Sequence, residues 1–113
     1  QHGVHINPNG DLQVFDNSIW DKKSGTLAFH LDTVKKIATT TIKAMLPRDK
    51  YSARMGSGYL LPNGKLLQTS SKTGNVMVTD QEGKILWQLN AYFVPYRGEY
   101  IPETTWKSYF KKL

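Results

Sequence analysis

A Pro-Asn-Gly turn occurs twice in this chain, and each copy lies between two short apolar segments. The first copy is Pro8-Asn9-Gly10 and the second is Pro62-Asn63-Gly64. Asn-Gly is favoured in the tight turns that join antiparallel strands, because both residues tolerate a positive φ. Each copy therefore predicts a β-hairpin, and the repetition predicts two copies of one structural unit.

A second hairpin is predicted after the first one in both copies. In the first copy the expected strands are 3–7, 11–16, 26–31 and 36–46, and in the second they are 57–61, 65–70, 76–79 and 84–89. Asn9 and Asn63 are 54 positions apart, whereas Asp32 and Asp80 of the later turns are 48 apart. We attribute this difference to a longer polar loop, residues 17–25, in the first copy.

Tandem four-stranded units with a spacing near 50 residues are typical of a β-propeller, whose blades are four-stranded sheets. We therefore predict an all-β chain of tandem antiparallel sheets, with blade-like repeats at 1–50 and 51–102. Residues 103–113 would form a tail or a short helix that covers an open face, because Trp106, Tyr109 and Phe110 have helical spacing. Two blades cannot close a ring, so further blades or other copies of the chain are expected partners. A small sandwich of the two sheets is the alternative.

Composition narrows the class of protein. The chain has 39% hydrophobic residues and a formal net charge of +6, but its lysines are scattered in pairs beside turns. This distribution favours solvated turns over a nucleic-acid surface, although a basic cleft would attract small anions. The absence of cysteine excludes disulfides and thiolate metal sites, and no apolar run approaches the ~20 residues of a membrane span. The chain begins with Gln and has no signal segment, so we expect a piece of a longer chain or a processed one.

Several stretches carry a resemblance to a known family. They are "QHGVHINPNGDLQVFDN", "YSARMGSGYLLPNGKLLQTSS", "GNVMVTDQEGKILWQLN" and "PYRGEYIP". Together, over most of residues 1–102, they resemble the C-terminal blades of the arylsulfotransferase family of bacterial aryl-sulfate sulfotransferases. The resemblance implies about two blades of a six-bladed propeller that transfers a sulfuryl group from a phenolic sulfate ester to a phenol. It implies a ping-pong reaction through a channel histidine, no cofactor, and a periplasmic or secreted location.

His2 and Arg54 are the predicted catalytic residues. A neutral imidazole is a competent nucleophile toward sulfur, and a nearby cation would offset the charge on the transferred group. His2 follows a glutamine, as a channel histidine does in the family, and Arg54 precedes the second inner strand as His2 precedes the first. We expect both at the same channel mouth. The alternatives are a terminal histidine without a role and a surface arginine.

The resemblance also implies substrate binding by Asn17, Tyr96 and Arg97. Asn17 belongs to a Phe-Asp-Asn segment that could instead cap the following turn, since Asp and Asn commonly do so. Tyr96 and Arg97 match the family's closing Tyr-Arg, and could instead pin the final strand.

The other histidines and Trp87 are given structural roles. His5 lies three residues after His2, so a regular pleat would place it on the opposite face of the strand. His30 is expected to be half-buried in an outer hairpin, and the three histidines do not have metal-ligand spacing. We therefore predict no metal site, and we expect Trp87 to pack in the core.

The chain departs from the family at two places. Thr26 stands where the family usually carries an arginine, and "SARMGSG" has no histidine where classical bacterial members have one. Both departures favour the second hypothesis, a non-catalytic propeller or small β-sandwich that binds a ligand or a protein partner.

Overall fold

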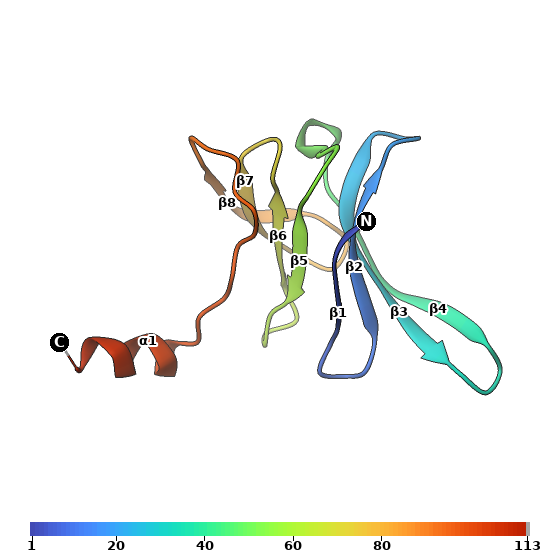
Figure 1. Cartoon of the computed structure of the whole chain (residues 1–113), viewed down its shortest axis with the longest axis horizontal. Helices are drawn as coiled ribbons and strands as arrows, with labels where there is room; N and C mark the ends of the chain where they lie inside the picture. The colour runs from blue at the N-terminus through green and yellow to red at the C-terminus, as the bar shows by residue number, and fades with distance from the viewer. Residues whose placement is uncertain (113) are drawn as a thin grey trace.

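The computed structural model describes residues 1–112, which form two four-stranded antiparallel sheets and one short C-terminal helix (Figure 1). The first sheet contains β1 (His2–Ile6), β2 (Leu12–Ser18), β3 (Lys23–Asp32) and β4 (Ile37–Met45). The second contains β5 (Ser57–Leu60), β6 (Leu66–Ser70), β7 (Asn75–Thr79) and β8 (Ile85–Asn90), after the 3-10 turn η1 (Arg48–Lys50). Strands follow one another in chain order within each sheet, as in the blades of a propeller. The all-β prediction with tandem sheets is confirmed.

The Pro-Asn-Gly turns have the same hydrogen bonds in both sheets. Asn7 N donates to Asp11 O, and Leu61 N donates to Lys65 O, each over 2.8 Å. The turn glycines adopt positive φ values of 90° at Gly10 and 80° at Gly64. These turns are therefore equivalent, as the repeat predicted.

The difference in length between the two copies lies in the strands. The connections 19–22 and 71–74 have equal lengths, whereas β2 and β3 have 7 and 10 residues against 5 and 5 in β6 and β7. Our attribution to a longer loop was therefore wrong. The ladder continues through Asn17↔Ser24 to Ser18↔Lys23, because these polar residues pair across the sheet instead of forming a loop.

The two sheets pack through their facing sides, where β1, β2 and β3 of the first sheet contact β5 of the second and β3 also contacts β6. One cluster contains Phe15, Leu46 and Met77, and another contains Ala28, Ile42, Ala44 and Leu66. Buried amides tie the sheets together: Gln13 Nε2 donates to Gly58 O over 2.7 Å. A Cβ at Gly58 would lie 1.9 Å from Thr26 Oγ1, so only glycine allows this approach.

The outer faces of the sheets are open. Val4 and Ile6 on β1 are each 61% exposed, and Trp87 on β8 is 53% exposed. The prediction that Trp87 packs in the core was wrong, because it pairs with Val78 across the sheet and no sheet lies over it among the described residues. Open apolar faces are what isolated propeller blades would present to their neighbours.

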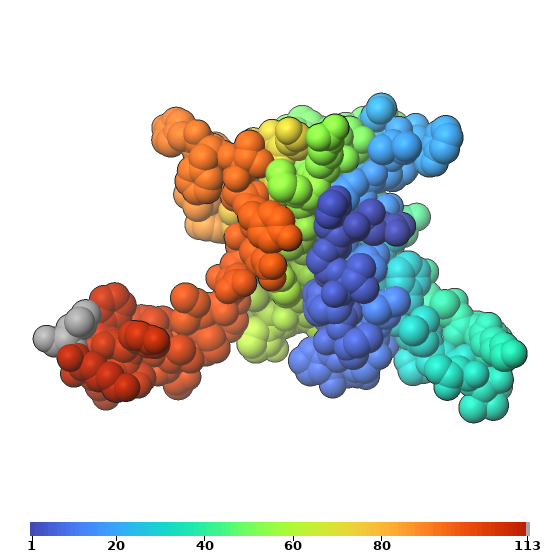
Figure 2. All heavy atoms as spheres, in the orientation of Figure 1, coloured from blue at the N-terminus to red at the C-terminus, as the bar shows by residue number. Residues whose placement is uncertain are grey.

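The terminal helix α1 (Glu103–Phe110) confirms the predicted helix but not its predicted position. It stands clear of the sheets, and none of its residues is buried (Figure 2). Trp106 and Phe110 instead contact each other, with ring centroids 5.7 Å apart. The expectation that this helix covers an open face of these sheets was therefore wrong, because the tail leads it away. In the part of the chain that the structure describes, no helix has the length and apolar character to cross a membrane.

Candidate functional site

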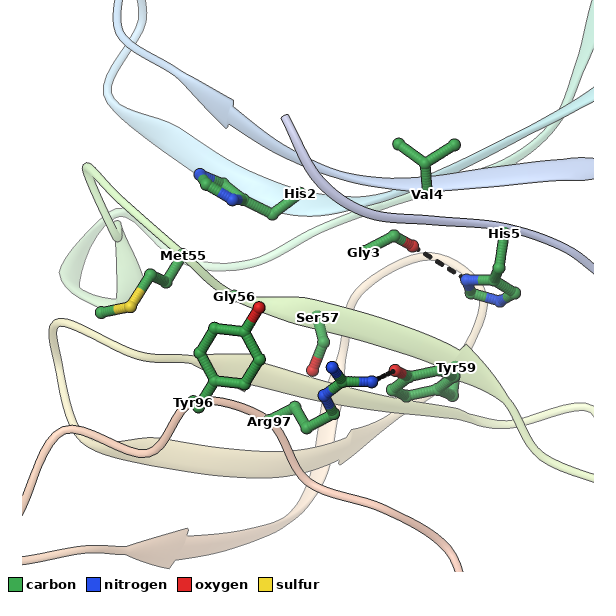
Figure 3. Close-up of a pocket in the computed structure, with 10 residues that line it drawn as sticks. All are labelled: His2, Gly3, Val4, His5, Met55, Gly56, Ser57, Tyr59, Tyr96 and Arg97. Carbon is green, nitrogen blue, oxygen red and sulfur yellow. Dashed lines mark hydrogen bonds between the residues drawn. The ribbon is translucent and has the colours of Figure 1, made fainter.

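A pocket of about 250 Å³ lies between the inner strands β1 and β5 and is closed on one side by the tail after β8 (Figure 3). Three distant segments of the chain supply its polar side chains: His2, His5, Ser57, Tyr59, Tyr96 and Arg97. Three of the predicted site residues, His2, Tyr96 and Arg97, therefore meet in one place.

A β-bulge at Gly3 brings both histidines into the pocket. His2 pairs with Phe15 and His5 pairs with Gln13, so β1 uses one more residue than β2 over this stretch. Gly3 has a φ of +62°, the left-handed conformation that glycine adopts readily. The prediction that His5 lies on the opposite face from His2 was wrong, because it assumed a regular pleat.

The His5 ring has a defined orientation. Its Nδ1 lies 2.8 Å from the carbonyl oxygen of Gly3, and a carbonyl can only accept, so Nδ1 carries the proton. In the neutral ring this leaves the Nε2 lone pair free. The ring also stacks on Tyr59, with centroids 5.1 Å apart. His5 can therefore accept a proton or act as a nucleophile without losing its anchor.

Arg97 is the cation of the pocket. Its Nη1 donates to the Tyr59 hydroxyl over 3.1 Å, and its guanidinium lies 5.1 Å from the centre of the Tyr96 ring. The hydrogen bond to Tyr59 raises the pKa of Arg97 above its ordinary value, so the guanidinium stays charged. Glu99 lies 3.8 Å from Nη1 and partly offsets this charge.

Hydrogen bonds fix the tail that carries Tyr96 and Arg97. Gly98 N donates to Thr69 Oγ1 over 2.7 Å, and Ser71 Oγ donates to the Tyr96 carbonyl over 3.3 Å. The tail therefore lies on the face of the second sheet that is turned away from the first, next to β6.

Arg54 and Asn17 lie outside the pocket. The Arg54 side chain is exposed, and its carbonyl accepts a hydrogen bond from Ser52 Oγ over 2.6 Å. Asn17 Nδ2 donates to the carbonyls of Ser52 and Met55, over 2.8 and 2.7 Å. Asn17 thus holds the segment that leads into β5, and Met55 of that segment lines the pocket.

His30 and Thr26 are separate from this site. His30 was predicted to be half-buried, but its side chain is 65% exposed because β3 continues beyond the packed region, and Nδ1 lies 3.3 Å from Asp11 Oδ1. Thr26 is fully buried and donates to Gln68 Oε1 over 2.9 Å. An arginine at position 26 would displace the sheet contact at Gly58. Within residues 1–112, no three His, Cys, Asp or Glu side chains converge on a point where they could hold a metal ion.

Sequence reasoning missed His5, Ser57 and Tyr59 as pocket residues. Ser57 and Tyr59 are two positions apart on β5 and share one face, a pattern that alternation along the predicted strand could have indicated. No local pattern indicated the bulge that turns His5 toward them.

Comparison with known proteins agrees with these observations. The family model described as "Arylsulfotransferase (ASST)" matches residues 1–92, which is most of the 113-residue chain. No curated protein and no solved structure matches the chain. The match covers both sheets and two of the three pocket segments, and the chain belongs to the arylsulfotransferase (ASST) family.

Proposed function

We propose that this chain is the C-terminal portion of an aryl-sulfate sulfotransferase and that its pocket holds the sulfuryl group. The observation that carries the proposal is the juxtaposition of His2 and His5 with Arg97 in one pocket. Imidazoles offer a nucleophile and a guanidinium offers charge-assisted hydrogen bonds to an oxyanion. The substrates are a phenolic sulfate ester and a phenol acceptor.

The reaction would proceed in two displacements. A ring nitrogen of His2 attacks the ester sulfur, the sulfur–oxygen bond to the aryl group breaks, and the phenolate leaves. The acceptor phenol then attacks the sulfur, the sulfur–nitrogen bond breaks to restore His2, and the proton of the acceptor ends on the phenolate released in the first step. Arg97 would offset the charge on the sulfuryl oxygens in both steps, where such stabilisation is largest.

The remaining predicted residues receive supporting roles. Arg54 would guide the anion toward the pocket, because it is exposed and directly precedes Met55, which lines the pocket. Asn17 would keep the same segment in place through its hydrogen bond to Met55 O. We also propose a periplasmic or secreted location, and further blades or other copies of the chain as the partners that cover the open sheet faces.

Turnover of 4-nitrophenyl sulfate with an acceptor phenol tests this function. We expect His2→Ala to reduce the rate at least 100-fold, since it removes the group that carries the sulfuryl group. His30→Ala is the matched control, because His30 is an exposed histidine outside the pocket, and it should react like the parent chain.

Peptide mass spectrometry of the reaction mixture identifies the sulfated residue. A sulfo-group on His2 supports His2 as the nucleophile, whereas a sulfo-group on His5 would show that His5 is the nucleophile instead. Binding of the ester without turnover in the parent chain would favour the alternative, a non-catalytic binding module.

A further inference from the structure

We propose that the Ser57 hydroxyl donates a hydrogen bond to the oxyanion held in this pocket, and that Ser57 and Arg97 together form its anion-binding subsite. The ligand class rests on the proposed function and is a sulfate ester. The role of Ser57 rests on its own geometry.

Ser57 is a buried side chain with an unused polar group. It is 3% exposed, it lines the pocket, and its Oγ makes no hydrogen bond in the described chain. An unpaired buried hydroxyl is unfavourable, so such groups are rare in folded proteins. Asn17 Oδ1 is the other buried side-chain atom without a partner among residues 1–112, and Asn17 does not line the pocket.

Other buried serines in this region do have partners. Ser24 Oγ donates to Ser52 O over 3.2 Å, Ser52 Oγ donates to Arg54 O over 2.6 Å, and Ser70 Oγ donates to Lys50 O over 2.6 Å. The chain therefore satisfies its structural hydroxyls near the inner strands. The exception, Ser57, is the one that faces the pocket.

The pocket offers an oxyanion two kinds of donor. In Figure 3 the Ser57 hydroxyl points from β5 toward the side of the pocket where Arg97 lies. Arg97 directs Nη1 to Tyr59, and the other guanidinium donors remain available to a ligand. None of the side chains that line the pocket is a carboxylate. A tetrahedral oxyanion can therefore accept from Ser57 and Arg97 with different oxygens.

Ser57 lies directly beside the bulge that carries His2 and His5. A Cβ built on Gly3 would lie 3.7 Å from the Ser57 Cβ, an ordinary contact distance, so the bulge packs against Ser57 at the pocket.

Ser57→Ala provides the test, measured by calorimetric titration with 4-nitrophenyl sulfate and by thermal unfolding of the full chain. We expect the affinity to fall about 10- to 100-fold, since a hydrogen bond to a charged group is lost. The melting temperature should not fall, because Ser57 Oγ has no protein partner to lose. 4-Nitrophenol, which lacks the sulfuryl group, should bind both proteins equally.

Ser70→Ala is the matched control. It removes a buried hydroxyl that has a partner, so it should lower the melting temperature and leave the affinity for the ester unchanged.

The outcomes separate this inference from the proposed function. Ester binding by Ser57→Ala equal to that of the parent chain overturns the role of Ser57, whether or not turnover is observed. If Ser57→Ala binds the ester more weakly and the parent chain shows no turnover, the subsite is supported and the proposed enzyme activity is rejected. A parent chain that does not bind the ester overturns both.

Discussion

The positive φ at Gly3, where β1 bulges, allows us to predict how much stability Gly3→Ala would lose. Gly3→Ala would place a side chain at a φ of +62°, which is unfavourable for an L-residue by roughly 1–2 kcal/mol. The new Cβ would lie 3.6 Å from Ser57 Cα, an ordinary contact distance, so conformational strain and not a clash sets the loss. At ~4–8 °C per kcal/mol for a domain near this size, we expect the melting temperature to fall by about 4–16 °C.

The same substitution should have a larger effect on function than on stability. The strand can relieve the strain by giving up the bulge, which shifts the register by one residue and turns His2 to the other face of the sheet. Turnover of 4-nitrophenyl sulfate should then fall as far as in His2→Ala. Gly3→Asn should retain more activity, because asparagine tolerates the left-handed conformation better than alanine.

Gly10→Ala is the control for backbone strain. Gly10 has a φ of +90°, and a Cβ there would meet nothing within 4 Å. This variant should lose a similar amount of stability and keep its activity, because the turn lies away from the pocket. Equal activity in Gly3→Ala and Gly10→Ala at equal stability would refute the idea that the bulge holds the histidines in the site.

Three further predictions concern the packing and charge of the fold. Gly56→Ala should lower the free energy of unfolding by about 2–5 kcal/mol in a denaturant titration, because its Cβ would lie 2.2 Å from Phe15 Cε1 and its φ is +117°; an unchanged midpoint would contradict the packing. Gln68→Ala should lower it by about 2–3 kcal/mol, since it leaves buried partners in both sheets unpaired; a loss below about 0.5 kcal/mol would argue against this bridge. The hydrogen bond from Thr41 lowers the pKa of Asp11 in the folded chain below its ordinary value of 3.8. The ionised Asp11 therefore stabilises the fold above pH 3.8, and this stabilisation is lost as the pH falls through the pKa of the folded state. Thr41→Val should raise the pKa of Asp11 in an NMR titration and weaken the acid dependence of unfolding; an unchanged titration would contradict it.

The turns could be predicted from the sequence because their causes are local. Asn9-Gly10 and Asn63-Gly64 place residues that tolerate positive φ between apolar segments, and the observed hairpins form there. Asp32 and Asp80 cap the later turns in the same local way, by accepting hydrogen bonds from backbone N–H groups two or more residues ahead. Strand number and order followed from these positions.

The errors had non-local causes. Trp87 carries a side chain typical of a core, but among the described residues no second sheet packs on its face of β8, so more than half of it is exposed. His30 was placed in an outer hairpin of a compact blade, but β3 continues beyond the packed region and leaves it exposed. His5 was placed by counting along a regular strand, and that count crossed the bulge between His2 and His5. Alternation of side chains along a strand predicts which face of the sheet a residue lies on only as far as the first bulge.

The pocket explains why Arg97, and not Arg54, is the cation beside His2. Arg54 was chosen because it precedes the second inner strand as His2 precedes the first, which assumes that equivalent positions in two blades face the same point. The tail breaks this equivalence, because it lies on the second sheet alone and is tied there at Thr69 and Tyr59. The tail places the guanidinium of Arg97, which is about forty positions after Arg54 in the sequence, in the same pocket as His2. The candidate site in this chain therefore depends on a segment that follows the last strand, and variants that release this tail should weaken ester binding while both sheets stay folded.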